Sequence, residues 1–127
     1  MVEILVRDTD TGRVSPEGFL DWDSLAAKAA EIWLKECGIK GEVKDVEVLQ
    51  RGFKPQVSIN SDGRIVIRLI PWLRLAKVKL KGGAEEEPHR TVYVPDSDVL
   101  IVLDFETSRT LYKFLRTVSV DNWYRFV

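Results

Sequence analysis

Basic side chains are concentrated in one stretch of the chain, residues 48–84. This stretch holds eight lysines and arginines and a single acidic residue, Asp62, whereas the remainder holds 11 basic and 19 acidic residues. The eight basic residues are Arg51, Lys54, Arg64, Arg68, Arg74, Lys77, Lys79 and Lys81. A cationic surface attracts polyanions through its electric field and through release of their counterions. We therefore predict that these side chains bind phosphate groups.

Aromatic residues accompany the basic stretch. Phe53 and Trp72 lie within it, and Tyr93 follows a little later. Bases of a single strand stack on aromatic rings while basic groups hold the phosphates. The eleven residues together predict a single-stranded nucleic-acid-binding surface, for DNA or for RNA. Two alternatives remain open: a charge-rich surface of a heat-adapted protein, and a basic face that binds an acidic protein partner.

The residue types needed for catalysis or metal binding are scarce. The chain has one histidine, His89, and one cysteine, Cys37, which cannot build a normal zinc site or a disulfide. It contains no glycine-flanked serine elbow and no phosphate-binding Walker loop. We predict a protein without catalytic residues, metal ions or cofactors.

One acidic motif is an exception. The apolar run Val99–Leu103 ends in Asp104-Phe105-Glu106, which resembles the first motif of DEDD-type exonucleases, where both carboxylates hold catalytic metals. Asp121 is the only acidic residue after Glu106, whereas that family places further carboxylates downstream. The alternative is that Glu106 and Thr107 begin the last helix, where acidic residues are favourable. We favour the helix start over the nuclease.

Helical periodicity is clearest between Asp21 and Cys37. Apolar residues recur there at three-to-four spacing, Gly38 ends the pattern, and Trp22 and Trp33 are predicted core residues. A first strand is expected at Val2–Arg7, followed by a turn at Asp8–Gly12. A last helix is expected at Ser108–Val118, with an aromatic tail at Asn122–Phe126 that packs on the core.

A β-hairpin is predicted around a Ser61-Asp62-Gly63 loop. In that register Asn60 faces Arg64, one face of the hairpin is aliphatic, and the other is polar and basic. We expect residues 51–55 and Pro71-Trp72 to interrupt the strands, and a β-bulge near Leu75-Ala76 to bring Lys77, Lys79 and Lys81 onto one face. Lysines in such a row also suit an edge strand that must avoid aggregation. Residues 82–88 are expected to form a solvated acidic loop, and further strands are expected at Val43–Gln50, Thr91–Val94 and Val99–Phe105.

These elements predict an α+β fold in one domain, residues 1–127. An antiparallel sheet would carry helices on one face and a basic, aromatic face or cleft on the other. No apolar run approaches the ~20 residues of a membrane span, and the N-terminal residues do not resemble a signal peptide. We therefore expect a soluble, cytoplasmic protein that does not bind membranes.

The chain resembles the ThermoDBP and ThermoDBP-related proteins of hyperthermophilic archaea. The likeness rests on Phe19-Leu20-Asp21-Trp22-Asp23-Ser24-Leu25, on Ala29-Ala30-Glu31-Ile32-Trp33 and on the basic, strand-rich middle. The resemblance implies single-stranded DNA binding in a cleft with an aromatic floor and basic walls. Founding members dimerise through a C-terminal zipper, and no heptad pattern follows Val118, so homo-oligomerisation is left open.

Overall fold

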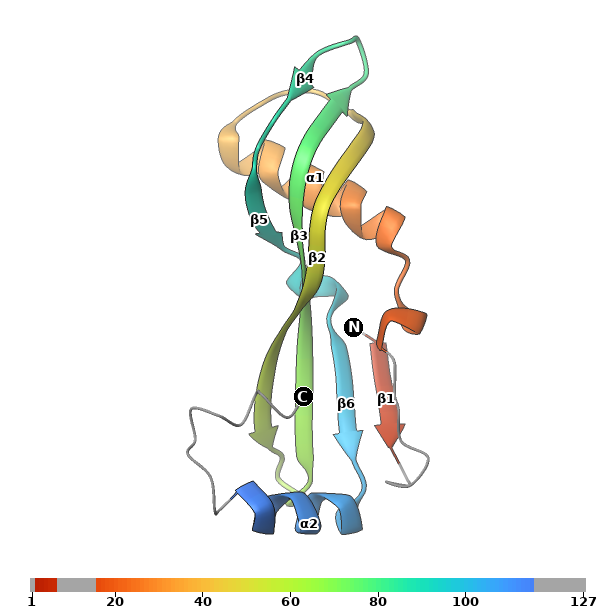
Figure 1. Ribbon diagram of the computed structural model, residues 1–127, viewed down its shortest axis with the longest axis vertical. Helices are drawn as coiled ribbons and strands as arrows, with labels where there is room; N and C mark the ends of the chain where they lie inside the picture. The colour runs from red at the N-terminus through yellow and green to blue at the C-terminus, as the bar shows by residue number, and fades with distance from the viewer. Residues whose placement is uncertain (1, 7–15, 116–127) are drawn as a thin grey trace. The chain divides into compact units, whose positions relative to one another are not determined.

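A computed structural model describes residues 2–6 and 16–115, which form a six-stranded, mostly antiparallel sheet with two α-helices (Figure 1). The predicted α+β class is confirmed. The predicted turn at Asp8–Gly12 and the aromatic tail at Asn122–Phe126 lie outside the described residues. The elements are β1 (Val2–Val6), η1 (Pro16–Phe19), α1 (Trp22–Cys37), β2 (Val43–Ile59), β3 (Ile65–Leu80), β4 (Glu85–Glu86), β5 (Arg90–Tyr93), η2 (Pro95–Ser97), β6 (Val99–Leu103) and α2 (Phe105–Leu115).

Residue contacts divide the chain into two compact units. Unit 1 comprises residues 1–19, 54–70 and 98–127, and unit 2 comprises residues 20–53 and 71–97. The strands β2 and β3 each contribute one part to either unit. The expectation of a single domain stays a prediction, and each unit is described by itself.

In unit 2, α1 begins and ends with the expected caps. The Asp21 carboxylate accepts the backbone N–H groups of Asp23 and Ser24, and the Ser24 hydroxyl donates to it at 2.7 Å. This hydroxyl, followed by the Ser24 backbone N–H, lowers the pKa of Asp21. Gly38 ends α1 at a φ of 67°, which a glycine adopts without steric cost. The predicted helix is confirmed.

The core of unit 2 lies between α1 and the strands β3 and β5, and Figure 1 shows α1 crossing one face of these strands. Trp33 is buried in this core as predicted, whereas Trp22 is half-buried and packs against its margin. The core residues are Leu25, Ala26, Ala29, Ala30, Trp33 and Leu34 of α1, Leu73, Leu75, Val78 and Leu80 of β3, Val92 of β5, and Val94.

In unit 1, β6 pairs in parallel with β1 and antiparallel with β3. The predicted hairpin loop is confirmed, because the N–H of Asn60 donates to the Arg64 carbonyl at 2.9 Å and Gly63 turns with a φ of 80°. Ile65 and Ile67 are buried and alternate with the partly exposed Arg64 and Arg68. The alternation of faces in this part of β3 is therefore as expected.

The predicted interruptions at residues 51–55 and at Pro71-Trp72 are wrong, because β2 and β3 run through both. Pro55 lies on β2, which is at the end of the strand order, and edge strands tolerate proline. The pairing of β3 with β6 ends at Leu69, and its pairing with β5 begins at Trp72. Pro71 lies between these two ladders, and its carbonyl accepts the N–H of Val94.

Other assignments also differ from the expected ones: β5 begins at Arg90 and ends at Tyr93, and β6 ends at Leu103. Glu85 and Glu86 were expected in a solvated loop but form β4, paired with Lys79 and Val78 of β3. The α2 helix begins at Phe105 rather than at Ser108. The change of phase expected near Leu75-Ala76 is present, since Leu73 and Leu75 are buried before it and Val78 and Leu80 after it.

Candidate functional site

The strands of unit 2 present one face to α1 and the other to solvent. Leu73, Leu75, Val78 and Leu80 pack toward α1. Successive side chains of a strand point to opposite faces, so the residues between them point away from the helix. We call this second surface the open face, and no described helix of unit 2 covers it. Its residues are Gly52 of β2, Trp72, Arg74, Lys77 and Lys79 of β3, Glu85 of β4, and Thr91 and Tyr93 of β5.

Two aromatic rings lie next to each other on the open face. Trp72 pairs directly with Tyr93 in the antiparallel ladder, which brings their side chains to the same side of the sheet. Tyr93 is 46% exposed, and Trp72 is half-buried. On its other side the Trp72 ring covers Gly52, where a Cβ would lie only 2.7 Å from Trp72 Cζ2. The absence of a side chain at Gly52 thus allows the indole to approach β2 this closely.

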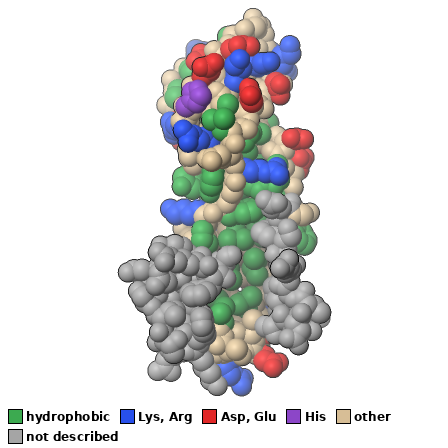
Figure 2. Space-filling view, in the orientation of Figure 1, with side chains coloured by type: hydrophobic (Ala, Val, Ile, Leu, Met, Phe, Trp, Pro, Cys, Tyr) green, Lys and Arg blue, Asp and Glu red, His purple; other side chains and the backbone are tan. Residues whose placement is uncertain are grey.

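Basic side chains continue the open face along β3. Arg74 lies opposite Thr91 and is exposed, and Lys79 lies opposite Glu85 and is exposed. Within the described residues neither cation forms an ion pair. The Lys77 ammonium, by contrast, lies 3.5 Å from a Glu85 carboxylate oxygen. Figure 2 shows basic and acidic side chains interleaved over the end of unit 2 that carries β4.

Arg51 and Phe53 lie on the other side of β2 from the open face. Gly52 faces Trp72, so its two neighbours point toward α1 by alternation. The Arg51 guanidinium lies 4.8 Å from the centre of the Trp22 ring, and the rings of Trp22 and Phe53 are 5.5 Å apart. The Trp22 indole N–H is buried and has no partner within the described residues. These predicted binding residues therefore pack around the start of α1.

The remaining predicted cations have partners of their own. Lys81 lies beyond the end of β3, and its ammonium is 3.0 Å from Glu42. Lys54, Arg64 and Arg68 belong to unit 1. The structure thus brings five of the eleven predicted residues together on the open face: Trp72, Arg74, Lys77, Lys79 and Tyr93.

Arg64 and Arg68 are engaged within unit 1. Arg64 Nε donates to the Leu103 carbonyl at 2.9 Å, and its guanidinium lies 5.1 Å from the centre of the Phe105 ring. Arg68 forms an ion pair with Asp98, whose side chain is only 1% exposed. Both arginines therefore already have interaction partners within unit 1: the Leu103 carbonyl and the Phe105 ring for Arg64, and the Asp98 carboxylate for Arg68.

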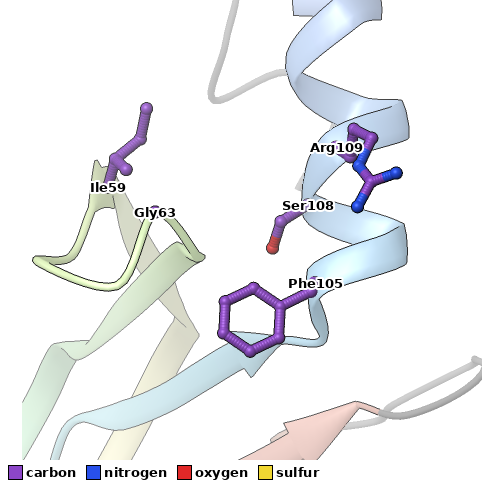
Figure 3. A pocket seen from close by; sticks show the side chains of 5 residues that line it. All are labelled: Ile59, Gly63, Phe105, Ser108 and Arg109. Carbon is purple, nitrogen blue, oxygen red and sulfur yellow. The ribbon is translucent and has the colours of Figure 1, made fainter.

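Unit 1 also contains an open pocket of about 390 Å³ at the start of α2. In Figure 3, Phe105 and Ser108 point from α2 toward the hairpin loop at Gly63. The Ser108 hydroxyl already accepts the N–H of Ile65 at 3.0 Å. The lining adds the apolar side chain of Ile59 and the guanidinium of Arg109.

The Asp104-Phe105-Glu106 motif marks a helix start. The Asp104 carboxylate accepts the backbone N–H of Thr107 at 2.7 Å, and this bond is the main cause of a lowered pKa for Asp104. Glu106 is exposed in the first turn of α2. Within residues 2–6 and 16–115, no three His, Cys, Asp or Glu side chains are grouped so as to hold a metal ion.

Reasoning from the sequence missed three residues of the open face, Gly52, Glu85 and Thr91. Gly52 could have been noticed as a glycine inside a β-rich stretch, which often marks close approach by another group. Glu85 carried no such signal, because its pairing with the lysines depends on β4, which was expected to be a loop.

Comparison of the chain with protein-family models, with curated proteins and with solved structures finds no match. The resemblance to the ThermoDBP proteins therefore stays a prediction. Among the helices in the described part of the chain, none has the length and apolar character needed to cross a membrane.

Proposed function

We propose that the open face binds single-stranded nucleic acid without catalysing a reaction. Trp72 and Tyr93 stack on bases, and Arg74 and Lys79 bind phosphates. The observation that carries this proposal is the Trp72–Tyr93 pair, two neighbouring rings on a sheet face that no described helix of unit 2 covers. Beside them lie two cations without ion-pair partners in the described chain. Sequence preference is weak because every base has a stacking face. A cytoplasmic location and a relationship to the ThermoDBP proteins belong to the same proposal.

The direct test is titration of the protein into fluorescently labelled oligo-dT, oligo-U and a matched duplex at several salt concentrations. Each phosphate contact with a single strand contributes about −0.7 to the slope of log K against log salt. Contacts from Arg74 and Lys79 alone predict a slope of about −1.4. Absence of single-strand binding at low salt, or tighter binding of duplex, would disprove the proposal. The dT and U arms distinguish DNA from RNA.

Stacking on Trp72 has its own test. Trp72→Ala should weaken oligo-dT binding roughly 5- to 150-fold, since base stacking contributes about 1–3 kcal/mol. Phe19→Ala is the matched control, because Phe19 is also an aromatic residue with a partly exposed side chain (52%) and is not part of the open face. It should bind as the unmodified protein does, and equal losses in both variants would contradict a role specific to Trp72.

The mixed charge of the open face also suits a protein partner. Glu85 lies among the lysines, and the rim of protein interfaces is polar and solvent-accessible. The intrinsic fluorescence distinguishes the two functions. Added oligonucleotide should quench a tryptophan on which bases stack, whereas a surface that binds only a protein should not respond.

A further inference from the structure

Glu85 places a carboxylate among the lysines of the open face. Its oxygen lies 3.5 Å from Lys77 Nζ, and it is directly opposite Lys79 in the β3–β4 ladder. The chain returns to β3 through Gly82 and Gly83, which have φ values of 102° and 95°. These left-handed conformations suit glycine and form the tight turn that brings Glu85 back beside the lysines. The turn and the β3–β4 ladder therefore fix the position of Glu85 beside the lysines.

We propose that Glu85 is a specificity-determining residue that competes with the ligand's phosphates for Lys77 and Lys79. This inference rests on the proposed function and adds a feature that the function alone does not require. A carboxylate and a phosphate both accept hydrogen bonds from an ammonium group, so the two anions exclude each other at one lysine.

The Lys77–Glu85 pair is weak enough to be displaced. Both side chains are partly exposed, at 31% and 49%, and exposed ion pairs contribute only about 0.2–1 kcal/mol. An isolated anion gains little by replacing Glu85, because it exchanges one weak pair for another. A single strand whose bases already stack on Trp72 and Tyr93 holds its phosphates near the lysines at high local concentration. Glu85 thus favours stacked, multiply charged strands over free nucleotides and other small anions.

The test compares Glu85→Gln with Glu31→Gln in the full chain. Both variants lose one negative charge, but Glu31 is exposed on α1, away from the open face. We expect Glu85→Gln to bind labelled oligo-dT about two- to five-fold more tightly at low salt, as release of an exposed pair allows. Its salt slope should be steeper by up to about 0.7 because a further phosphate contact forms. Glu31→Gln should change affinity by less than about twofold.

A double-mutant cycle identifies the lysine that is released. In a Lys77→Gln background, Glu85→Gln should lose most of its gain in affinity, because the competed cation is absent. Thermal unfolding of each variant shows whether the fold is retained.

Equal affinities of Glu85→Gln and Glu31→Gln would overturn this inference while leaving the proposed function intact. If neither the unmodified protein nor Glu85→Gln binds single strands, the proposed function itself is wrong and the inference fails with it.

Discussion

Gly52→Ala tests whether stability and nucleic-acid binding depend on the close approach of the Trp72 ring to Gly52. A Cβ at residue 52 would lie 2.7 Å from Trp72 Cζ2 and 3.0 Å from Cε2. To restore an ordinary contact of at least 3.4 Å, the ring must move by about 0.7 Å or more. Leu73 is fixed in the core beside it, so the movement has to come from rotation of the indole away from β2.

The size of the effect follows from the surroundings of the ring. Overpacking inside a core costs about 1–3 kcal/mol, and we expect the lower end, about 1 kcal/mol, because Trp72 is half-buried and can yield toward solvent. A tilted ring loses part of its stacking with a base. Because a full stack contributes about 1–3 kcal/mol, we expect oligo-dT binding to weaken about 5- to 20-fold.

Urea unfolding measures the change in stability, and anisotropy of a labelled oligo-dT measures the change in affinity. Gly18→Ala is the matched control, since no atom lies within 4 Å of its added Cβ and Gly18 is not among the positive-φ glycines. We expect that control to leave the affinity unchanged and the stability unchanged or up to about 1 kcal/mol higher, because alanine lowers the entropy of the unfolded chain. Lower stability with unchanged affinity would show that bases do not stack on Trp72. Unchanged stability would refute the close approach of the ring to Gly52.

Three further outcomes are expected. Arg68→Met leaves the buried Asp98 without its cation and should lower the free energy of unfolding by about 1–3 kcal/mol, and an unchanged urea midpoint would contradict this. The pKa values of Asp21 and Asp104 are lowered from 3.8 in the folded protein. Their stabilising contributions as helix caps are therefore complete above pH 3.8 and are lost as the pH falls through the lower folded-state pKa values. Helicity measured by circular dichroism should persist until the pH is below about 3.8. Incubation with Mn²⁺ should leave labelled single strands intact, and degradation that Asp104→Asn abolishes would instead establish a nuclease.

Elements with local signals were predictable from the sequence. The α1 helix carries its apolar period, its Asp21 cap and its Gly38 end within one segment, and the hairpin loop at Ser61-Asp62-Gly63 is equally local. The continuity of β2 and β3 was not predictable. Whether a proline breaks a strand depends on which neighbour needs its N–H, and Pro71 is tolerated because it lies between the β6 and β5 ladders.

The sequence predicted the residue types of the candidate site, basic and aromatic. It did not predict which of these residues lie together on the open face. Period-two alternation correctly places Lys77 and Lys79 on one side of β3. The partners of the other cations lie far away in the sequence: Arg68 pairs with Asp98 across 30 positions, and Lys81 pairs with Glu42 across 39. Such pairings depend on strand order, which composition and periodicity do not determine.

The salt dependence of binding shows how many basic residues contact phosphates, which can be fewer than the number that the sequence contains. If all eight cations of residues 48–84 met phosphates of a single strand, the slope of log K against log salt would be about −5.6. The structure pairs Lys77, Lys81 and Arg68 with acids and leaves Arg74 and Lys79 on the open face, which predicts about −1.4. Each of these three pairs that the ligand displaces should add about −0.7 to the slope, which would reach about −3.5 if all three opened. Because Asp98 is buried, the Arg68 pair should be the last to open, since separating it would leave a carboxylate without compensation.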